Sequence, residues 1–215
     1  MPITLDADLD PALYPLAWLI GSWSGEGAAQ VPGADGELVG RRIRQHLDAT
    51  ADGTELRWTQ RTWVLDAPPP VPPTAALSEE GRAAQEQADA AAAAVGSERE
   101  LLLEETGTWT VGEPLPGQDL QAARTAKPGS PEATISFALE ARFTDQDGTV
   151  ESYVGEVRGP RIQLACQDVT PVGADTHIAA RRMFGLVGGR LMWVLDRMPA
   201  DGEMDSYLSV ELDRG

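Results

Sequence analysis

Apolar and polar residues alternate with a period of two along most of the chain beyond residue 21, which is the pattern of half-buried β-strands. The first two runs of this kind hold Leu47 and Leu56, and between them lies Asp52-Gly53, a dipeptide typical of two-residue hairpins. The pattern resumes near residue 100, with turn signals such as Asp147-Gly148 and Gly188-Gly189 between its runs. The strands predicted in this second part cover residues 101–103, 106–111, 134–143, 148–157, 161–169, 177–186, 190–196 and 207–213.

The number and spacing of these runs predict an all-β fold. About ten strands follow one another at intervals of roughly 8 to 14 residues, with no helical pattern between them. An antiparallel up-and-down meander closed into a barrel leaves no unpaired edge strand, and a two-sheet sandwich is the alternative. A short helix precedes the first strand, because Asp10-Pro11 can start it, Leu13 and Leu16 recur at helical spacing, and Gly21 ends it.

Residues 67–98 interrupt the strand pattern. They begin with a proline-rich run that cannot pair in a sheet, because proline lacks the donor and fixes φ. Alanine, glutamate and glutamine dominate the rest, a composition that favours a helix, although a face made of alanine buries little area. We therefore expect a single barrel domain over residues 1–215, with residues 67–98 as an exposed or partly helical insertion within one loop.

The composition narrows the function classes. Among 215 residues, 17 are basic and 34 acidic, and the formal net charge of −17 disfavours binding to nucleic acid or to anionic membranes. No apolar run reaches the roughly 20 residues of a membrane helix, and no basic segment opens the chain as in a secretory signal. Cys166 is the only cysteine, which excludes an internal disulfide and a cysteine-rich zinc site. These features predict a cytoplasmic protein without a metal site.

Gly21, Trp23, Gly25 and Gly27 form a Gly-x-Trp-x-Gly-x-Gly motif directly after the predicted helix. Alternate glycines are also found in phosphate-binding loops, but here a strand follows and no Lys-Ser/Thr pair is present, so we do not expect nucleotide binding. Two interpretations stay open. The glycines permit tight strand curvature while Trp23 plugs one end of the barrel, or these residues contact a ligand in a pocket.

With this motif the sequence resembles the nitrobindins, a family of fatty-acid-binding-protein-like (calycin) β-barrels. Further matches follow in the family's order and spacing: Pro32, Gln60-Arg61-Thr62-Trp63, Glu105-x-Gly107 and the closing segment Tyr207-Leu208-x-x-x-Leu212-x-Arg214. The resemblance covers most of the chain outside residues 67–98. It implies a barrel of the same type with the glycine-tryptophan motif at its ligand pocket.

The resemblance also implies a function. Nitrobindins hold ferric haem b in the barrel mouth through one axial histidine, isomerise peroxynitrite to nitrate and bind nitric oxide. The position of that histidine is Tyr207 in this sequence, and Val210 stands where the family has alanine. Because the ferric chemistry depends on a neutral imidazole, we expect instead a small apolar or planar ligand in the interior. We assign no catalytic residue, and peroxynitrite isomerisation is expected only if haem is bound.

Two alternatives stay open. Tyr207 could itself ligate ferric haem, as tyrosinate does in catalases, if a cation such as Arg197 or Arg214 lies beside it; the protein would then act on peroxynitrite or nitric oxide. The barrel could instead carry a fatty acid or another lipid, for which an inward arginine is needed. The candidates for that arginine are Arg57, Arg142 and Arg181. The oligomeric state stays open, with a homodimer as one option.

Strand parity places Tyr207 on a polar face. It shares that face with Ser209 and Glu211, whereas Leu208 and Val210 lie on the apolar face. Parity alone therefore points Tyr207 towards solvent, and only the family comparison or a bulge turns it inward.

Other candidate side chains have simpler interpretations. His46 shares its parity with polar neighbours and is expected on the outer face, His177 is expected to be partly exposed at a strand start, and Cys166 is expected to be a buried inert thiol. Glu104, Glu105 and Glu151 could suggest acid–base chemistry, but the adjacent Glu104 and Glu105 point to opposite faces of a strand, so we expect no catalytic pair. Several of the six tryptophans are expected to line or plug the apolar interior; the six are Trp18, Trp23, Trp58, Trp63, Trp109 and Trp193.

Overall fold

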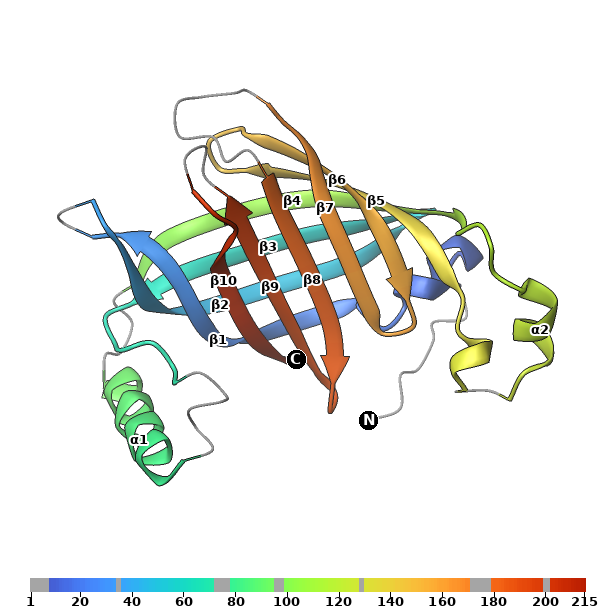
Figure 1. The fold of residues 1–215 in the computed structure, drawn as a ribbon. Coiled ribbons are helices and arrows are strands. Elements are labelled where there is room, and N and C mark those ends of the chain that lie inside the picture. The colour runs from blue at the N-terminus through green and yellow to red at the C-terminus, as the bar shows by residue number, and fades with distance from the viewer. Residues whose placement is uncertain are drawn as a thin grey trace.

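Over the residues that the structure describes, the chain forms a closed barrel of ten antiparallel strands (Figure 1). The computed structural model describes residues 8–33, 36–71, 78–94, 99–127, 130–170, 179–198 and 202–215. Each strand pairs with its neighbours in sequence, and the last returns to the first, which confirms the up-and-down barrel over the sandwich. The strands are β1 (Gly21–Pro32), β2 (Leu38–Asp52), β3 (Glu55–Leu65), β4 (Arg99–Pro114), β5 (Ser136–Asp145), β6 (Val150–Arg158), β7 (Arg161–Thr170), β8 (Ala179–Val187), β9 (Arg190–Met198) and β10 (Asp205–Arg214).

Glycines at the hairpin turns take the left-handed conformation that these turns require. Gly53, between β2 and β3, has φ of 61°, and Gly148, between β5 and β6, has φ of 81°. Gly188 and Gly189 have φ of 61° and 89°, as both central residues of a type I′ turn must. The turn signals in the sequence therefore fix where one strand ends and the next begins.

The helices are short and lie outside the barrel wall or at its end. The first, η1 (Pro11–Leu16), is a 3₁₀-helix capped by Asp10, whose carboxylate accepts from the Ala12 N–H at 2.9 Å. It is shorter than predicted, because Pro15 has no N–H with which to continue α-helical bonding. Its Leu13 and Leu16 are fully buried and cover one end of the barrel. The other helices are α1 (Glu79–Ala94), α2 (Leu120–Thr125) and η3 (Pro131–Ala133).

Helix α1 lies between β3 and β4 in the chain and is held to the barrel wall by ion pairs. Arg42 of β2, only 6% exposed, donates from Nε to Glu26 of β1 at 2.7 Å and from Nη2 to Asp89 of α1 at 2.6 Å. The backbone N–H of Val71 donates to Gln85 Oε1 at 2.7 Å, which fixes the segment before the helix to α1. No described helix is long and apolar enough to cross a membrane.

Aromatic side chains fill the middle of the barrel. The Trp58 ring centroid lies 5.3 Å from that of Trp109, and Phe184 stacks on Trp193 at 5.1 Å, with Phe143 edge-on to Trp109 at 5.5 Å. All five are at most 2% exposed. The barrel is therefore packed at this level rather than hollow, and a ligand of the interior has to lie towards an end.

Gly25 and Gly27 of the motif lie where the backbone of β10 leaves no room for a side chain on β1. A Cβ on Gly25 would lie 2.2 Å from the Glu211 carbonyl oxygen, and one on Gly27 would lie 2.0 Å from the Ser209 carbonyl oxygen and 2.7 Å from Val210 Cα. These contacts are with backbone, which cannot rotate away. Glycine at these two positions therefore permits β10 to close the barrel against β1.

Replacing Gly27 with alanine tests this role. We expect the free energy of unfolding to fall by about 1–3 kcal/mol, because the methyl group forces the two strands apart. The matched control is Gly185→Ala in β8, where a Cβ would meet nothing closer than 3.9 Å. Urea unfolding followed by tryptophan fluorescence measures both variants. Equal losses in the two would show that close approach of β10 is not what Gly27 provides.

Candidate functional site

Tyr207 lies at a break in the register of β10. Ser206 pairs with Asp196 of β9, but Leu208 pairs with Leu195, so Tyr207 is the extra residue of a β-bulge. Leu208 is 1% exposed, and Tyr207 is also packed, partly buried, against the hydrophobic core. The bulge thus turns Tyr207 towards the core, and the solvent-facing orientation that parity alone predicted is wrong.

Arg197 of β9 covers the ring of Tyr207. Its guanidinium carbon lies 4.4 Å from the ring centroid, within the range of a cation–π interaction. Arg197 Nη2 also donates to Glu151 Oε1 of β6 at 3.0 Å, so the guanidinium is fixed on its other side. Of the two cations expected as neighbours of Tyr207, the structure places Arg197 beside it. Arg214 lies at the other end of β10, over the ring of Trp23 at 4.3 Å.

Glu151 connects this pair to a charge cluster inside the barrel. Arg182 of β8 is fully buried and donates to both carboxylate oxygens of Glu105 at 2.7 Å, and to Glu151 at 2.9 Å. Burial opposes the charge of Arg182, but Glu105 and Glu151 outweigh it and hold the pKa of the guanidinium well above its usual value. Arg182 therefore stays charged, and it joins β4, β6 and β8 from within.

Two further groups border the cluster. Tyr153 donates to Glu151 Oε2 at 2.6 Å, and burial, reinforced by the Glu151 charge, raises the pKa of its phenol. Cys166 is half-buried, and burial together with Glu151 raises the pKa of its thiol, which keeps it protonated and unreactive. Neither group supplies an anion that could act as a nucleophile at neutral pH.

Buried amides line the wall opposite β8. Gln45 donates to Thr62 at 2.8 Å and accepts from the Trp193 indole at 2.8 Å. Gln60, on β3 directly opposite Glu105, is fully buried, yet neither its amide oxygen nor its nitrogen has a partner in the described part of the chain. A buried amide without partners is rare in proteins, so Gln60 marks a place where a water molecule or a polar ligand atom is required.

The motif residues and Tyr207 do not meet. Trp23 is fully buried, its indole donates to the Leu19 carbonyl at 2.8 Å, and it pairs with Arg214 at the far end of β10. Arg214 in turn donates to the Trp18 carbonyl at 2.6 Å, which ties β10 to the segment after η1. Trp23 therefore fills the end of the barrel that η1 covers, several residues along the strand from Tyr207.

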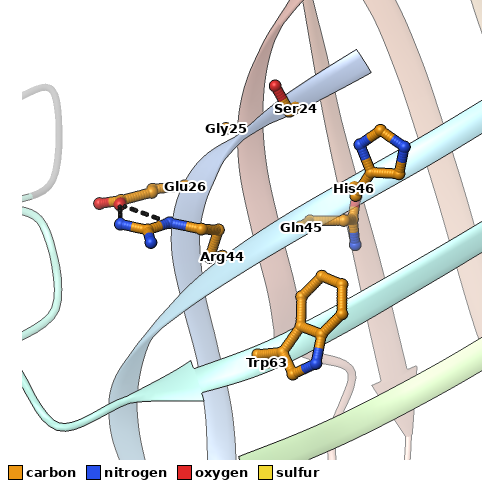
Figure 2. A pocket seen from close by; sticks show the side chains of 7 residues that line it. All are labelled: Ser24, Gly25, Glu26, Arg44, Gln45, His46 and Trp63. Carbon is orange, nitrogen blue, oxygen red and sulfur yellow. Dashed lines mark hydrogen bonds and ion pairs between the residues drawn. The ribbon is translucent and has the colours of Figure 1, made fainter. Parts of the chain in front are cut away.

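A hollow of about 450 Å³ lies on the outer wall over the glycine motif (Figure 2). Glu26 and Arg44 pair across it, and His46 lies on its border. His46 is half exposed and pairs with Asp48 at 3.1 Å, so it is on the outer face, as its parity predicted. Ser22 also donates to Asp48, and no hydrogen bond joins His46 to a serine here, so these groups do not form a catalytic triad. His177 lies outside the described residues.

The three arginines proposed as inward lipid anchors, Arg57, Arg142 and Arg181, are all exposed, so that prediction is wrong. The inward arginine is the next residue, Arg182, whose parity with Ala180 and Phe184 was a usable signal. Sequence reasoning named Glu105 and Glu151 but set them aside, because it judged the group by the opposite orientations of Glu104 and Glu105. Their pairing across the barrel could not be read from local spacing.

Comparisons with known proteins agree with this architecture. Residues 12–214 match the model of the THAP4-like, heme-binding beta-barrel domain. A ferric nitrobindin-like protein of Beutenbergia cavernae is 33% identical over 100% of this chain and 99% of its own. A peroxynitrite isomerase of Leifsonia xyli is 29% identical over 98% of each chain. The crystal structure of Rv2717c from M. tuberculosis shares the fold with a TM-score of 0.59, at 20% identity over 97% of this chain and 99% of that one.

The matching domain description implies a haem, so the side chains at the Tyr207 end of the barrel, here called the mouth, are compared with what a haem requires. Among the described residues, the side chain that the family resemblance aligns with the axial histidine is the phenol of Tyr207, which lies partly buried against the core. His46 is held outside the barrel by Asp48. The described residues therefore do not fit a haem held by a neutral histidine.

Removing the positive charge of Arg182 tests the buried cluster. We expect Arg182→Met to lower the free energy of unfolding by about 3–5 kcal/mol, because the buried Glu105 loses its cation and Glu151 keeps only Arg197. Adding Glu105→Gln and Glu151→Gln should recover part of that loss. Arg190→Met, which removes an exposed arginine paired with Asp213, is the control and should cost about 1 kcal/mol or less. Chemical denaturation measures all of them, and a loss no larger than that of the control would contradict the assignment.

The raised pKa of Tyr153 gives a pH-dependent prediction. The folded state keeps this phenol protonated, so its contribution to stability is fully present below the unfolded value of 10.0 and is lost as the pH rises above it. Wild type should therefore exceed Tyr153→Phe in stability by about 1 kcal/mol at neutral pH, and the difference should vanish or reverse between pH 10 and 11. Denaturation across that range measures it, and a constant difference would show that the phenol ionises equally in both states.

Proposed function

The chain belongs to the THAP4-like, haem-binding β-barrel family, the nitrobindins, and from this premise we propose that it binds a small planar ligand at the barrel mouth beside Tyr207, without a histidine ligand to iron. On this proposal the protein does not isomerise peroxynitrite. The observation that carries it is the inward Tyr207 at the bulge. The sequence resemblance aligns this residue with the family's axial histidine.

The shape and charge of the interior support a planar ligand over an extended lipid. The aromatic layer of Trp58, Trp109 and Trp193 fills the middle of the barrel, so a long chain finds no channel there. The two inward guanidinium groups, Arg182 and Arg197, are both paired with carboxylates, so a fatty-acid headgroup finds no free cation among the described residues of the interior. A flat ring system beside Tyr207 and Arg197 needs neither a long channel nor a free cation.

One observation favours a second function, a haem held by Tyr207 itself. A phenolate bound to ferric iron carries negative charge, and the Arg197 guanidinium lies 4.4 Å from the ring of Tyr207. Under this alternative Tyr207 would hold the iron and Arg197 would balance the ligand's charge. Activity towards peroxynitrite or nitric oxide would then follow from the bound haem.

Titration with two porphyrins separates these functions. Protoporphyrin IX, which has no iron, and hemin should bind wild type with affinities within about threefold of each other, because no protein group ligates the iron. Tyr207→Phe should leave both affinities unchanged, and Tyr207→His should bind hemin at least about tenfold more tightly than protoporphyrin. Tryptophan quenching measures the affinities and the Soret band measures ligation.

Three other results of these titrations would contradict the proposal in different ways. A wild-type Soret band that Tyr207→Phe abolishes would establish the tyrosine-ligated haem in place of our leading proposal. Absence of binding by either porphyrin in wild type, with binding restored in Tyr207→His, would show that the mouth accepts a planar ligand only through iron ligation. Absence in both proteins would overturn a planar ligand altogether.

A further inference from the structure

A second groove, of about 750 Å³, lies on the outer wall of the barrel and is separate from the mouth. It crosses β1, β10, β9 and β8 and ends at the turn before β7, while the segment before α1 forms its other wall. This volume is within the range of small-molecule sites. Residues that line it include Val71, Gln85, Arg161, Met183, Leu186 and Met192.

The strand register explains why the wall is hollowed here. One row of directly paired residues runs from Glu26 through Glu211, Met192 and Gly185 to Arg161. Gly185 of β8 stands in this row between Met192 and Arg161 and has no side chain, so the wall is hollowed at this point. A Cβ there would meet nothing closer than 3.9 Å. Strands lie about 4.8 Å apart, so the row from Glu211 to Arg161 spans about 14 Å.

The floor of the groove is apolar and unusually exposed. Met183 is 42% exposed and Met192 is 37% exposed, and Val187 at the end of β8 is 59% exposed. Methionine side chains are flexible and polarisable, and they adapt to apolar ligands of different shape. Large apolar side chains gathered on one face point to an occupant that covers them.

The charged residues along this row determine which end of the groove can bind a charged group of a ligand. Glu26 is paired with Arg42 and Arg44, and Glu211 with Arg190, so the acidic end is already neutralised. Arg161, at the opposite end, lies against the uncharged amide of Gln163 and has no carboxylate partner among the described residues. A negative group on a ligand would therefore be bound at the Arg161 end.

The α1 side of the groove is held in place rather than loose. Gln85 accepts from the Val71 N–H and donates to Asp89 at 2.8 Å, and Asp89 pairs with Arg42 on the barrel. The Arg42 and Gln85 contacts lower the pKa of Asp89, so the carboxylate stays ionised at neutral pH. The groove is therefore a cleft between two fixed walls.

From these observations we propose that the outer groove is a second ligand site, which binds a small amphipathic monoanion. Its apolar chain lies over Met183 and Met192, and its carboxylate pairs with Arg161. A free amphiphile is favoured over an anionic membrane surface because the chain carries a net charge of −17.

Sodium decanoate, below its micelle concentration, is the probe. We expect saturable shifts of the Met183 and Met192 methyl signals in methionine-methyl NMR, with the Met198 signal unmoved. Arg161→Gln should weaken binding about fivefold, and Arg142→Gln, which removes another exposed outer-wall arginine, should leave it unchanged. Gly185→Leu should abolish binding with the fold intact, because the new side chain has room and fills the groove.

The opposing outcomes are distinct. Equal binding of decanol and decanoate, or full affinity in Arg161→Gln, would overturn the anion assignment. Loss of decanoate binding in Tyr207→Phe would place the ligand at the barrel mouth instead. Full binding by Gly185→Leu would overturn the groove as the site.

Discussion

The structure depends on one constraint, the burial of the Arg182 charge inside an apolar barrel. A guanidinium removed from water is stable only when carboxylates and hydrogen bonds replace the solvent, and here Glu105 and Glu151 supply them from β4 and β6. Glu151 then has a second cation to hold, Arg197, which covers Tyr207. The orientation of Tyr207 is thus linked through charge pairs to the barrel wall on the opposite side.

This arrangement also determines what the interior can accept. The two buried or half-buried arginines and their two carboxylates cancel in formal charge, so an ionic ligand would have to break an existing pair. The aromatic layer centred on Trp58 closes the channel below them. The proposed planar ligand would instead contact Tyr207, and the unpartnered amide of Gln60 is a buried polar group that it could meet without displacing an ion pair.

The sequence predicted the barrel because alternation and turn residues are local signals. Ten strands, their order and the outward position of His46 all followed from them. The charge cluster did not follow, because the partners of Arg182 lie 77 and 31 residues away and only closure of the barrel brings them together. Tyr207 was an intermediate case, since its inward orientation requires a bulge that no residue type in this segment signals.

Trp23, which pairs with Arg214, and Tyr207 lie at opposite ends of β10 and have separate roles. Gly25, Gly27 and Trp23 act on closure, since they permit contact between β1 and β10 and fill the end covered by η1. Tyr207 is placed by the bulge and by Arg197, neither of which involves those residues. A substitution at position 207 can therefore change the chemistry at the mouth while the barrel stays closed. On the proposed function, this is how the chain keeps the family's fold and motif with a tyrosine at the position that the resemblance aligns with the axial histidine.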